Sequence, residues 1–259
     1  SDARKADLMP GRAPRAPSRL RPRSARGAWQ ALSLWLAASA PGAGLAQQIT
    51  AAEYADPTTR YAHAVLGDAE EWGALDLTLA DGRRLRLVLP ETLVFEDTAP
   101  RLADVDGDGS AEVIVVETSL RQGARLAIYD ASGRIAATPF IGRTHRWLAL
   151  VGAADLDGDG FVEIAYIDRP HLAKTLRIWR YRHGDLVEVA NAPGLTNHKI
   201  GWDHIPGGVR KCGPAPELIT ASGDWTRIMA GTLQGGRIAT RDIGPFTGPD
   251  SLTAALTCP

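Results

Sequence analysis

Two short acidic segments, nearly identical in sequence, constrain the fold of this chain more than any other feature. They are residues 104–112 (DVDGDGSAE) and residues 155–163 (DLDGDGFVE), and they start 51 residues apart (155 − 104). Each has carboxylates at positions 1, 3, 5 and 9 and glycine at positions 4 and 6. Carboxylates at this density repel one another unless a cation lies among them, and Ca²⁺ takes roughly six to eight oxygen ligands. Because glycine also permits the positive φ angles of a tight loop, the pattern predicts two loops that hold a hard divalent cation.

The residues beside these segments have the character of strands, which excludes an EF-hand. An EF-hand needs a helix on each side and a bidentate Glu at its twelfth position. The twelfth position of the first segment is Val115, inside the β-branched run 113–116, and the run 147–151 before the second segment is also apolar. We therefore predict strand–loop–strand units. A plain Asp/Gly hairpin turn without metal is the alternative, and two copies at a regular spacing disfavour it.

The N-terminal residues 1–46 differ in composition from the rest of the chain. They hold eight Lys/Arg against two Asp, followed by an apolar core at 28–38 and small residues up to Ala46. This order is typical of a signal peptide, and the apolar core is shorter than the roughly 20 residues of a membrane span. We predict cleavage after Ala46 and a periplasmic or extracellular protein; a disordered cytosolic tail is the alternative. The remainder has 21 basic (29 − 8) and 28 acidic (30 − 2) residues, a net charge of −7 that disfavours nucleic-acid binding.

The strand-like runs recur with a period of about 50 residues, which is typical of β-propeller blades. Residues 112–117 (EVIVVE) correspond to 163–168 (EIAYID) and to 217–222 (ELITAS), with a weaker copy at 63–68. Residues 47–259 are therefore predicted to form one all-β propeller domain of four blades, each of four antiparallel strands. The last segment, 251–258, would supply the strand that completes the first blade and closes the ring.

The two cysteines fit this closure. Cys212 lies in the segment 202–212, which replaces the acidic loop in the last unit, and Cys258 ends the predicted closing strand. Both then lie on the same face of the propeller. In an exported chain a pair of cysteines favours one disulfide, worth about 4 kcal/mol in the chain-entropy model. Two free thiols are the alternative.

The acidic motif followed by an apolar strand resembles FG-GAP/VCBS repeats, the calcium-binding propeller repeats also found in integrin α-chain heads and in many bacterial secreted proteins. The resemblance is strongest over residues 101–182. It implies that two Ca²⁺ ions are bound by the side chains at positions 1, 3, 5 and 9 and by the carbonyl at position 7. The implied ligands are Asp104, Asp106, Asp108, Ser110 (carbonyl) and Glu112 in the first loop, and Asp155, Asp157, Asp159, Phe161 (carbonyl) and Glu163 in the second. Segment 202–212 has one carboxylate and two cationic side chains, so we expect no calcium there.

The end of the blades opposite the acidic loops carries a second group of polar residues. Strand direction places there the ends of the second strands and the starts of the leading strands, and His145 and His198 lie 53 residues apart (198 − 145), close to the repeat. The candidate ligand face comprises Asp68, Glu117, His145, Asp168, Arg169, His171, His198 and Asp224. These side chains can cap turns, bind a polar ligand, or act as general acids and bases.

Two functions remain open. The first is a non-enzymatic binding or assembly module stabilised by calcium, with an unidentified protein or polar ligand as partner. The second is a secreted hydrolase or lyase that uses the His/acid ring. No Gly-x-Ser-x-Gly, His-Glu-x-x-His or phosphate-binding loop occurs in the sequence, so we favour the first. We further expect a monomer with no membrane span after cleavage of the leader.

Overall fold

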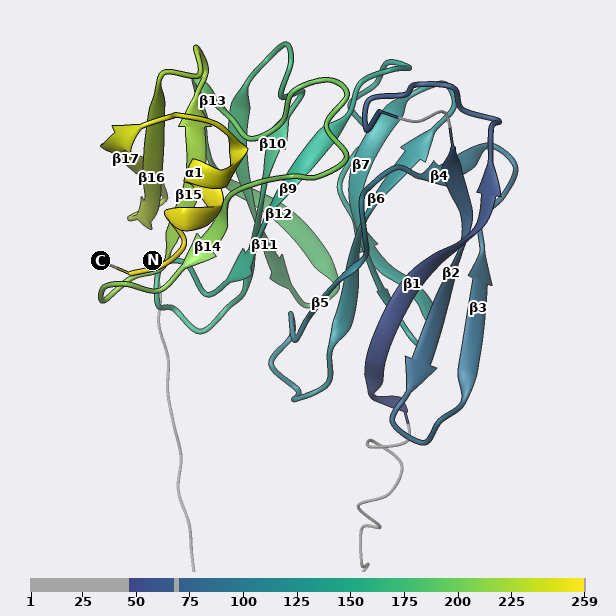
Figure 1. Ribbon diagram of the computed structural model, residues 1–259. Helices are drawn as coiled ribbons and strands as arrows, with labels where there is room; N and C mark the ends of the chain where they lie inside the picture. The colour runs from purple at the N-terminus through teal and green to yellow at the C-terminus, as the bar shows by residue number, and fades with distance from the viewer. Residues whose placement is uncertain (1–46, 68–69, 259) are drawn as a thin grey trace, which may run out of the picture. The chain divides into compact units, whose positions relative to one another are not determined.

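The computed structural model describes residues 47–67 and 70–258, in which strands β1–β17 form three antiparallel sheets (Figure 1). The predicted leader, residues 1–46, and Asp68 lie outside the described residues. The all-β class predicted from the sequence is confirmed. No helix in the described part of the chain is long and apolar enough to span a membrane.

The first sheet combines an N-terminal meander with the first repeat. Its strands are β1 (Ile49–Thr58), β2 (Glu71–Leu79), β3 (Arg84–Val88), β4 (Leu93–Phe95), β5 (Arg101–Ala103), β6 (Glu112–Ser119), β7 (Gly123–Asp130) and β8 (Gly133–Ala137). Among the described residues, strand pairing connects the meander β1–β2–β3 to the repeat at one place, where Trp72 of β2 pairs with Phe95 of β4, and a shared apolar cluster packs the two together. Both β4 and β5 pair with β6, so the leading strand of this repeat is split in two.

The second and third sheets are the next two repeats. The second contains β9 (Leu148–Ala154), β10 (Glu163–Asp168), β11 (Thr175–Arg182) and β12 (Asp185–Pro193), and the third contains β13 (Leu195–Thr196), β14 (Gly208–Arg210), β15 (Glu217–Ser222), β16 (Arg227–Gln234) and β17 (Arg237–Pro245). The second sheet is the four-stranded unit that the repeat predicts. In the third sheet the leading strand is again split, because β13 and β14 both pair with β15. The acidic loops connect β5 to β6 and β9 to β10, as predicted.

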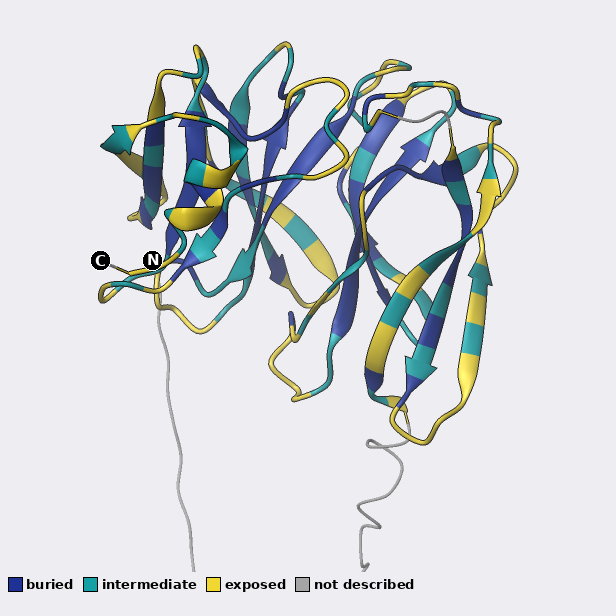
Figure 2. Cartoon of the chain, viewed as in Figure 1, coloured by how far each residue is buried: buried dark blue, intermediate teal, exposed yellow. Residues whose placement is uncertain are grey.

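The strands that follow these loops are the most buried (Figure 2). Every residue of β10 is buried, as is every residue of β6 except the last. Their runs of apolar and β-branched residues are continuous because neighbouring sheets cover both faces. One apolar cluster combines Val116 and Leu126 of the first sheet with Leu148 of the second. A second cluster joins the second and third sheets in the same way, so each repeat buries its faces against the next.

Two details of the predicted ring are wrong. The segment from His63 onward is not a strand, because the described residues 59–67 between β1 and β2 contain no extended element. The C-terminal segment does not complete a blade either, since it forms helix α1 (Pro249–Ala254). Pro in the first helical turn and Asp250 beside it both favour a helix start. Leu252 is then fully buried against the third sheet, where a strand would have exposed alternate side chains.

The predicted disulfide is confirmed. Cys212, in the loop before β15, is bonded to Cys258, just after α1, with a Cα–Cα distance of 5.3 Å. The bond ties the end of the chain to the third sheet, although that end is helical.

Candidate metal loops and ligand pocket

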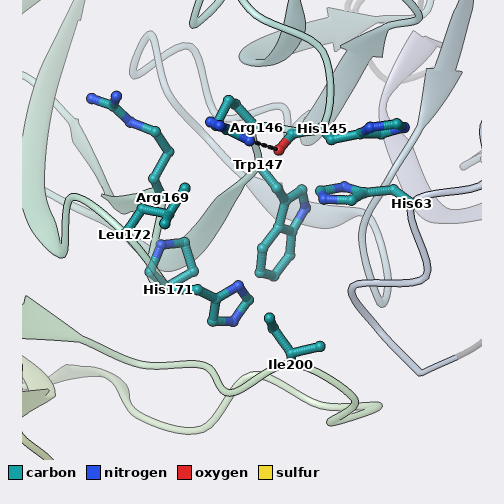
Figure 3. Close-up of a pocket in the computed structure, with 9 residues that line it drawn as sticks. His63, His145, Arg146, Trp147, Arg169, His171, Leu172 and Ile200 are labelled. Carbon is teal, nitrogen blue, oxygen red and sulfur yellow. Dashed lines mark hydrogen bonds between the residues drawn. The ribbon is translucent and has the colours of Figure 1, made fainter.

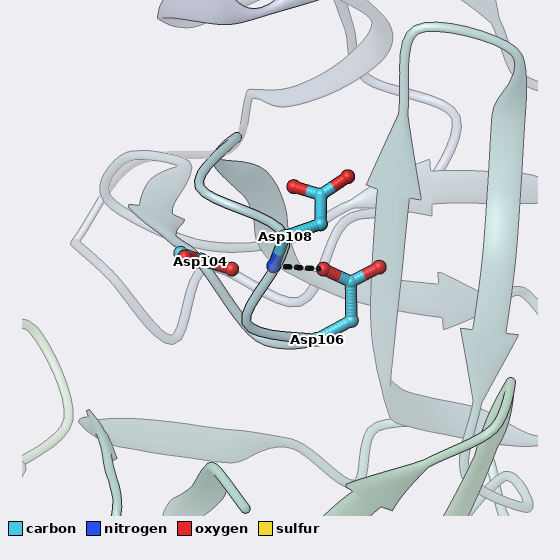
Figure 4. Close-up of side chains that lie close together, drawn as sticks. All are labelled: Asp104, Asp106 and Asp108. Carbon is cyan, nitrogen blue, oxygen red and sulfur yellow. Dashed lines mark hydrogen bonds between the residues drawn. The ribbon is translucent and has the colours of Figure 1, made fainter. Parts of the chain in front are cut away.

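The first acidic loop winds around its own carboxylates. Asp104 accepts hydrogen bonds from the backbone N–H groups of Gly107 (2.7 Å) and Gly109 (3.0 Å), and Asp106 accepts one from Asp108 (3.1 Å; Figure 4). Gly107 and Gly109 have φ angles of 79° and 89°, as the glycine pattern predicts. Asp104, Asp106 and Asp108 each offer a carboxylate oxygen, and these oxygens lie within 4.8 Å of one another.

Glu112 lies at the base of this loop and is almost fully buried. Its Oε2 accepts a hydrogen bond from the N–H of Val105 (2.8 Å). Burial, and then the negative charges of Asp106 and Asp108, raise the pKa of Glu112 to about 7. A cavity of about 190 Å³ beside these residues is also lined by Asp130 of β7, a carboxylate that the repeat pattern does not indicate. The donor set is therefore rich in oxygen and short of positive charge, and it fits a hard divalent cation such as Ca²⁺.

The second acidic loop has the same backbone arrangement but a different electrostatic environment. Asp155 accepts from the N–H groups of Gly158 (2.7 Å) and Gly160 (3.0 Å), just as Asp104 does in the first loop. Arg180 of β11, however, forms ion pairs with three of the loop's predicted ligands: Asp157 (2.6 Å), Asp159 (2.8 Å) and Glu163 (2.6 Å). The oxygens fit a cation, and a guanidinium of the chain itself already compensates their charge.

The third repeat replaces the acidic loop with arginines. Glu217, which corresponds to Glu112 and Glu163, accepts hydrogen bonds from Arg210 (2.8 Å) and Arg241 (2.6 Å). Arg210 also donates to the carbonyl oxygen of Ala255 (2.7 Å), just after α1. Here two guanidinium groups compensate the carboxylate at the base of the loop.

A pocket of about 290 Å³ lies at the opposite end of strand β9 from its acidic loop (Figure 3). Strand β9 begins at Leu148, beside the pocket, and the acidic loop follows its last residue. The residues lining the pocket are His63, His145, Arg146, Trp147, Arg169, Pro170, His171, Leu172 and Ile200. They come from the segment after β1, the loop before β9, the loop after β10 and the segment between β13 and β14, so the pocket lies where several repeats meet.

The indole of Trp147 organises the pocket. It lies between His63, to its right, and His171, below it, in Figure 3. Its ring is stacked on that of His171 (centroids 6.3 Å apart, planes 18° apart), and its Nε1 donates to the carbonyl oxygen of Glu96 (2.7 Å). Behind it, His198 lies 3.0 Å from His171, measured between Nδ1 and Nε2. Because a stacked ring, an edge-to-face ring and a hydrogen bond hold the indole, Trp147 forms a rigid aromatic wall.

The histidines of the pocket are held neutral. Burial, and then the charge of Arg146, lower the pKa of His63; burial, and then the charge of His198, lower the pKa of His171 to about 4. The pKa of His145 is lowered as well, by burial and then by His63 and Arg146. At neutral pH these imidazoles are hydrogen-bonding groups and carry no charge.

A buried carboxyl group supports His63 from behind. Oε1 of Glu96 lies 2.5 Å from Nδ1 of His63, and the hydroxyl of Thr118 donates to Oε2 (2.7 Å). Burial raises the pKa of Glu96 to about 8, with a smaller contribution from Asp97. Glu96 and His63 therefore form a neutral hydrogen-bonded pair rather than an ion pair at neutral pH.

Strained backbone surrounds the pocket. Ala64, His145 and Arg169 have φ angles of 54°, 54° and 48°, in the left-handed region that residues with a Cβ atom avoid. Hydrogen bonds hold two of them: the N–H of His145 donates to the hydroxyl of Tyr61 (2.8 Å), and that of Arg169 donates to the carbonyl of Trp147 (2.9 Å). Each such residue costs about 1 kcal/mol or more, and strain of this kind gathers at functional sites.

The predicted ligand face is only partly gathered at the pocket. His145, Arg169 and His171 line it, and His198 lies behind. Glu117 is instead bound by Arg125, Arg134 and Tyr129 in the first sheet, Asp168 by Arg169 and Arg177, and Asp224 by Ser222 and Thr226 in a turn. The repeat spacing does not indicate that Glu96, Arg146 or Trp147 belong to the pocket. His63 lies in the weakest copy of the repeat and was not among the predicted ligand-face residues. The contact of Arg180 with the second acidic loop was not predicted either, because the sequence of one strand does not show which loop a side chain reaches.

Comparison with known families places both acidic loops in one repeat type. Residues 104–166, from the first acidic loop through most of β10, match the FG-GAP-like repeat family. This segment is therefore an FG-GAP-like repeat, which confirms the resemblance seen in the acidic motif. No curated protein matches the chain.

Proposed function

We propose that this protein is a secreted, calcium-stabilised binding module with a propeller-like fold, and that its ligand occupies the histidine pocket. The pocket is the observation that carries the proposal. It is open, it has a rigid aromatic wall, and strained backbone surrounds it on a scaffold whose opposite end holds the acidic loops. Loops at one end of a rigid β scaffold are the usual place for binding sites.

Calcium has a structural role in this proposal. In the first loop Asp104, Asp106, Asp108, Glu112 and the Ser110 carbonyl would hold the ion, and the five corresponding residues would do so in the second. A bound ion relieves the mutual repulsion of these carboxylates and fixes the connection between a leading strand and the buried strand after it. The second site has to displace Arg180 from its three carboxylates, so we expect it to bind calcium more weakly.

The propeller-like arrangement uses the three repeats as blades. The meander β1–β3 would stand as a fourth, shorter blade, since its strand pairing with the first repeat consists, in the described part of the chain, of the single Trp72–Phe95 pair and the rest of the contact is apolar packing. In place of a closing strand, helix α1 and the disulfide would hold the C-terminal segment against the third sheet.

Export is supported by the disulfide, which fits an oxidising compartment, and by the leader-like composition of residues 1–46. Expression in a bacterial host followed by N-terminal sequencing tests it. We expect the exported protein to begin at Gln47. Export with Arg12 or Arg19 still attached would contradict the assignment.

One observation favours the enzymatic alternative. The Glu96–His63 pair has the form of an oriented base, since a carboxyl group fixes Nδ1 of an imidazole beside a cavity. The residues that line the pocket include no Ser, Thr or Cys to act as a nucleophile, so a hydrolase or lyase here would have to activate water or abstract a proton. Binding without turnover needs none of these steps, and we favour it.

The pocket is tested with benzyl alcohol, a neutral one-ring probe, in ligand-observed NMR. We expect it to bind wild-type protein and to lose binding in Leu172→Asp, which places a charge at the mouth. Val187→Asp is the matched control, because Val187 is an exposed apolar residue (56% against 62% for Leu172) outside the pocket. Equal binding by both variants, or no binding to wild type, would remove the pocket from the proposal.

A further inference from the structure

The charge of the pocket is not balanced. Arg169 forms two hydrogen bonds to Asp168 (2.8 and 2.9 Å), so its charge is locally compensated. Arg146 donates to the carbonyl oxygen of His145 (2.8 Å), and no carboxylate among the described residues lies within ion-pair distance of it. Since the imidazoles and the Glu96 carboxyl are neutral at neutral pH, Arg146 gives the described residues of the pocket a net positive charge.

The mouth of the pocket is apolar. Leu172, in the loop after β10, is 62% exposed, and Ile200, between β13 and β14, is 71% exposed. Large apolar side chains with this exposure are few in the described chain, and two of them rim the same cavity as Trp147. Water in contact with this rim is unfavourable, so an apolar group that covers it gains free energy.

The size of the cavity limits the ligand. A volume of about 290 Å³ lies at the lower end of the range for small-molecule sites. It has room for a single ring or a short chain with one polar group. One unpaired guanidinium matches one planar carboxylate, which it can bind through two parallel hydrogen bonds. A doubly charged phosphate would need a second free cation, and Arg169 is already bound to Asp168.

We infer that the pocket binds a small apolar monocarboxylate, with the carboxylate at Arg146 and the ring or chain against Trp147 between Leu172 and Ile200. The inference rests on the proposed binding function and specifies its ligand class. His63 and His145 line the same pocket, to the right of Arg146 in Figure 3, and can donate or accept further hydrogen bonds to the ligand or to a water beside it.

Three one-ring probes that differ in charge test the inference by calorimetric titration: phenylacetate, benzyl alcohol and benzylamine. We expect phenylacetate to bind at least about tenfold more tightly than benzyl alcohol, and benzylamine to bind most weakly. Acetate, which has the charge without the ring, should also bind at least about tenfold more weakly than phenylacetate.

Substitution of Arg146 separates the contribution of its charge to ligand affinity from the contribution of the shape of the cavity. Arg146→Gln should weaken phenylacetate by at least about tenfold and leave benzyl alcohol unchanged, because only the carboxylate uses the guanidinium. Arg143→Gln is the matched control: it removes one positive charge from the same loop, and Arg143 is exposed and does not line the pocket. Its affinity for phenylacetate should stay close to that of wild type.

The outcomes distinguish the two proposals. Two results would contradict the carboxylate class and keep the pocket as a binding site. In the first, benzyl alcohol binds and loses binding in Leu172→Asp, but phenylacetate binds no more tightly. In the second, benzylamine binds most tightly of the three. If Arg146→Gln and Arg143→Gln weaken phenylacetate binding equally, the effect comes from the overall charge of the protein, and the inference is wrong. If none of the four probes binds, both the ligand class and the proposed binding function fail.

Discussion

Arg180 of β11 and Glu163 at the base of the second acidic loop face each other across the β10–β11 pair, and their side chains are 2.6 Å apart. In the first repeat the corresponding place next to Glu112 is taken by Asp130, which follows the Val113–Tyr129 pair. Two nearly identical loops therefore have a cation beside one and an additional carboxylate beside the other. The difference between them lies in the neighbouring strand and outside the acidic motif.

This difference predicts unequal calcium sites. Calorimetric titration of the full chain should show one tighter site, lost in Asp106→Asn, and one weaker site, lost in Asp157→Asn. Arg180→Gln should tighten the weaker site by at least about tenfold, because it removes a positive charge within a few ångströms of the ion. Arg121→Gln is the matched control: it lowers the net charge equally, and Arg121 is an exposed residue in the turn between β6 and β7, away from the second loop. Equal tightening in both variants would contradict the role of Arg180.

The Glu96 carboxyl predicts a pH dependence of stability. Its pKa is raised from 4.5 to about 8, in contact with His63 and Thr118 and near Asp97, so between these values the folded protein holds a proton that the unfolded chain releases. The free energy of unfolding should therefore fall as pH rises through this window. Glu96→Gln keeps a hydrogen-bonding group and removes the titration.

Urea unfolding of wild type and Glu96→Gln at about pH 5 and about pH 9 measures this effect. The variant should gain at least about 1 kcal/mol relative to wild type between the two conditions. Taking the difference between the two proteins cancels other titrating groups. A difference that does not change with pH would mean that Glu96 is ionised in the folded state at both values.

The Arg210–Glu217 pair predicts a large effect of one buried arginine in the third repeat. Arg210 is 9% exposed and bonds both Glu217 and the Ala255 carbonyl. Arg210→Met should lower the free energy of unfolding by about 3 kcal/mol, because it leaves a largely buried carboxylate with one partner. Arg241→Met removes the other, more exposed partner and should cost about 1 kcal/mol or less. Equal losses measured by urea denaturation would contradict this ranking.

The disulfide should stabilise the folded chain by restricting the unfolded one. The double variant Cys212→Ser and Cys258→Ser should lose up to about 4 kcal/mol in urea unfolding, the chain-entropy value for a loop of this length. Wild type treated with a reductant should shift to the same stability, and the double variant should not respond. A reductant effect on the double variant would show that the loss has another cause.

The features that recur in each repeat could be predicted from the sequence. The features that depend on one particular contact could not. The acidic loops, the buried strands after them and the disulfide follow from spacing, because each repeat must bury the same faces against the next. The end of the chain was mistaken for a strand: its short apolar alternation does not reveal that Pro249 starts a helix and that Leu252 is buried on one side only. Of the pocket, His145, Arg169 and His171 followed from strand direction. Glu96 and Arg146 did not, because their roles depend on contacts with segments distant in the sequence.

The arrangement of the pocket has a consequence for how the chain responds to occupancy. In most repeat proteins each unit contacts only its neighbours, so the units can loosen one at a time. Here the hydroxyl of Tyr61 holds the backbone of His145, 84 residues along the chain, and Ile200 of a later segment faces the same cavity. A molecule that fills this cavity touches the N-terminal segment and two further repeats at once. Because such a molecule binds only when these segments are held together, a higher concentration of it would stabilise the contacts between them.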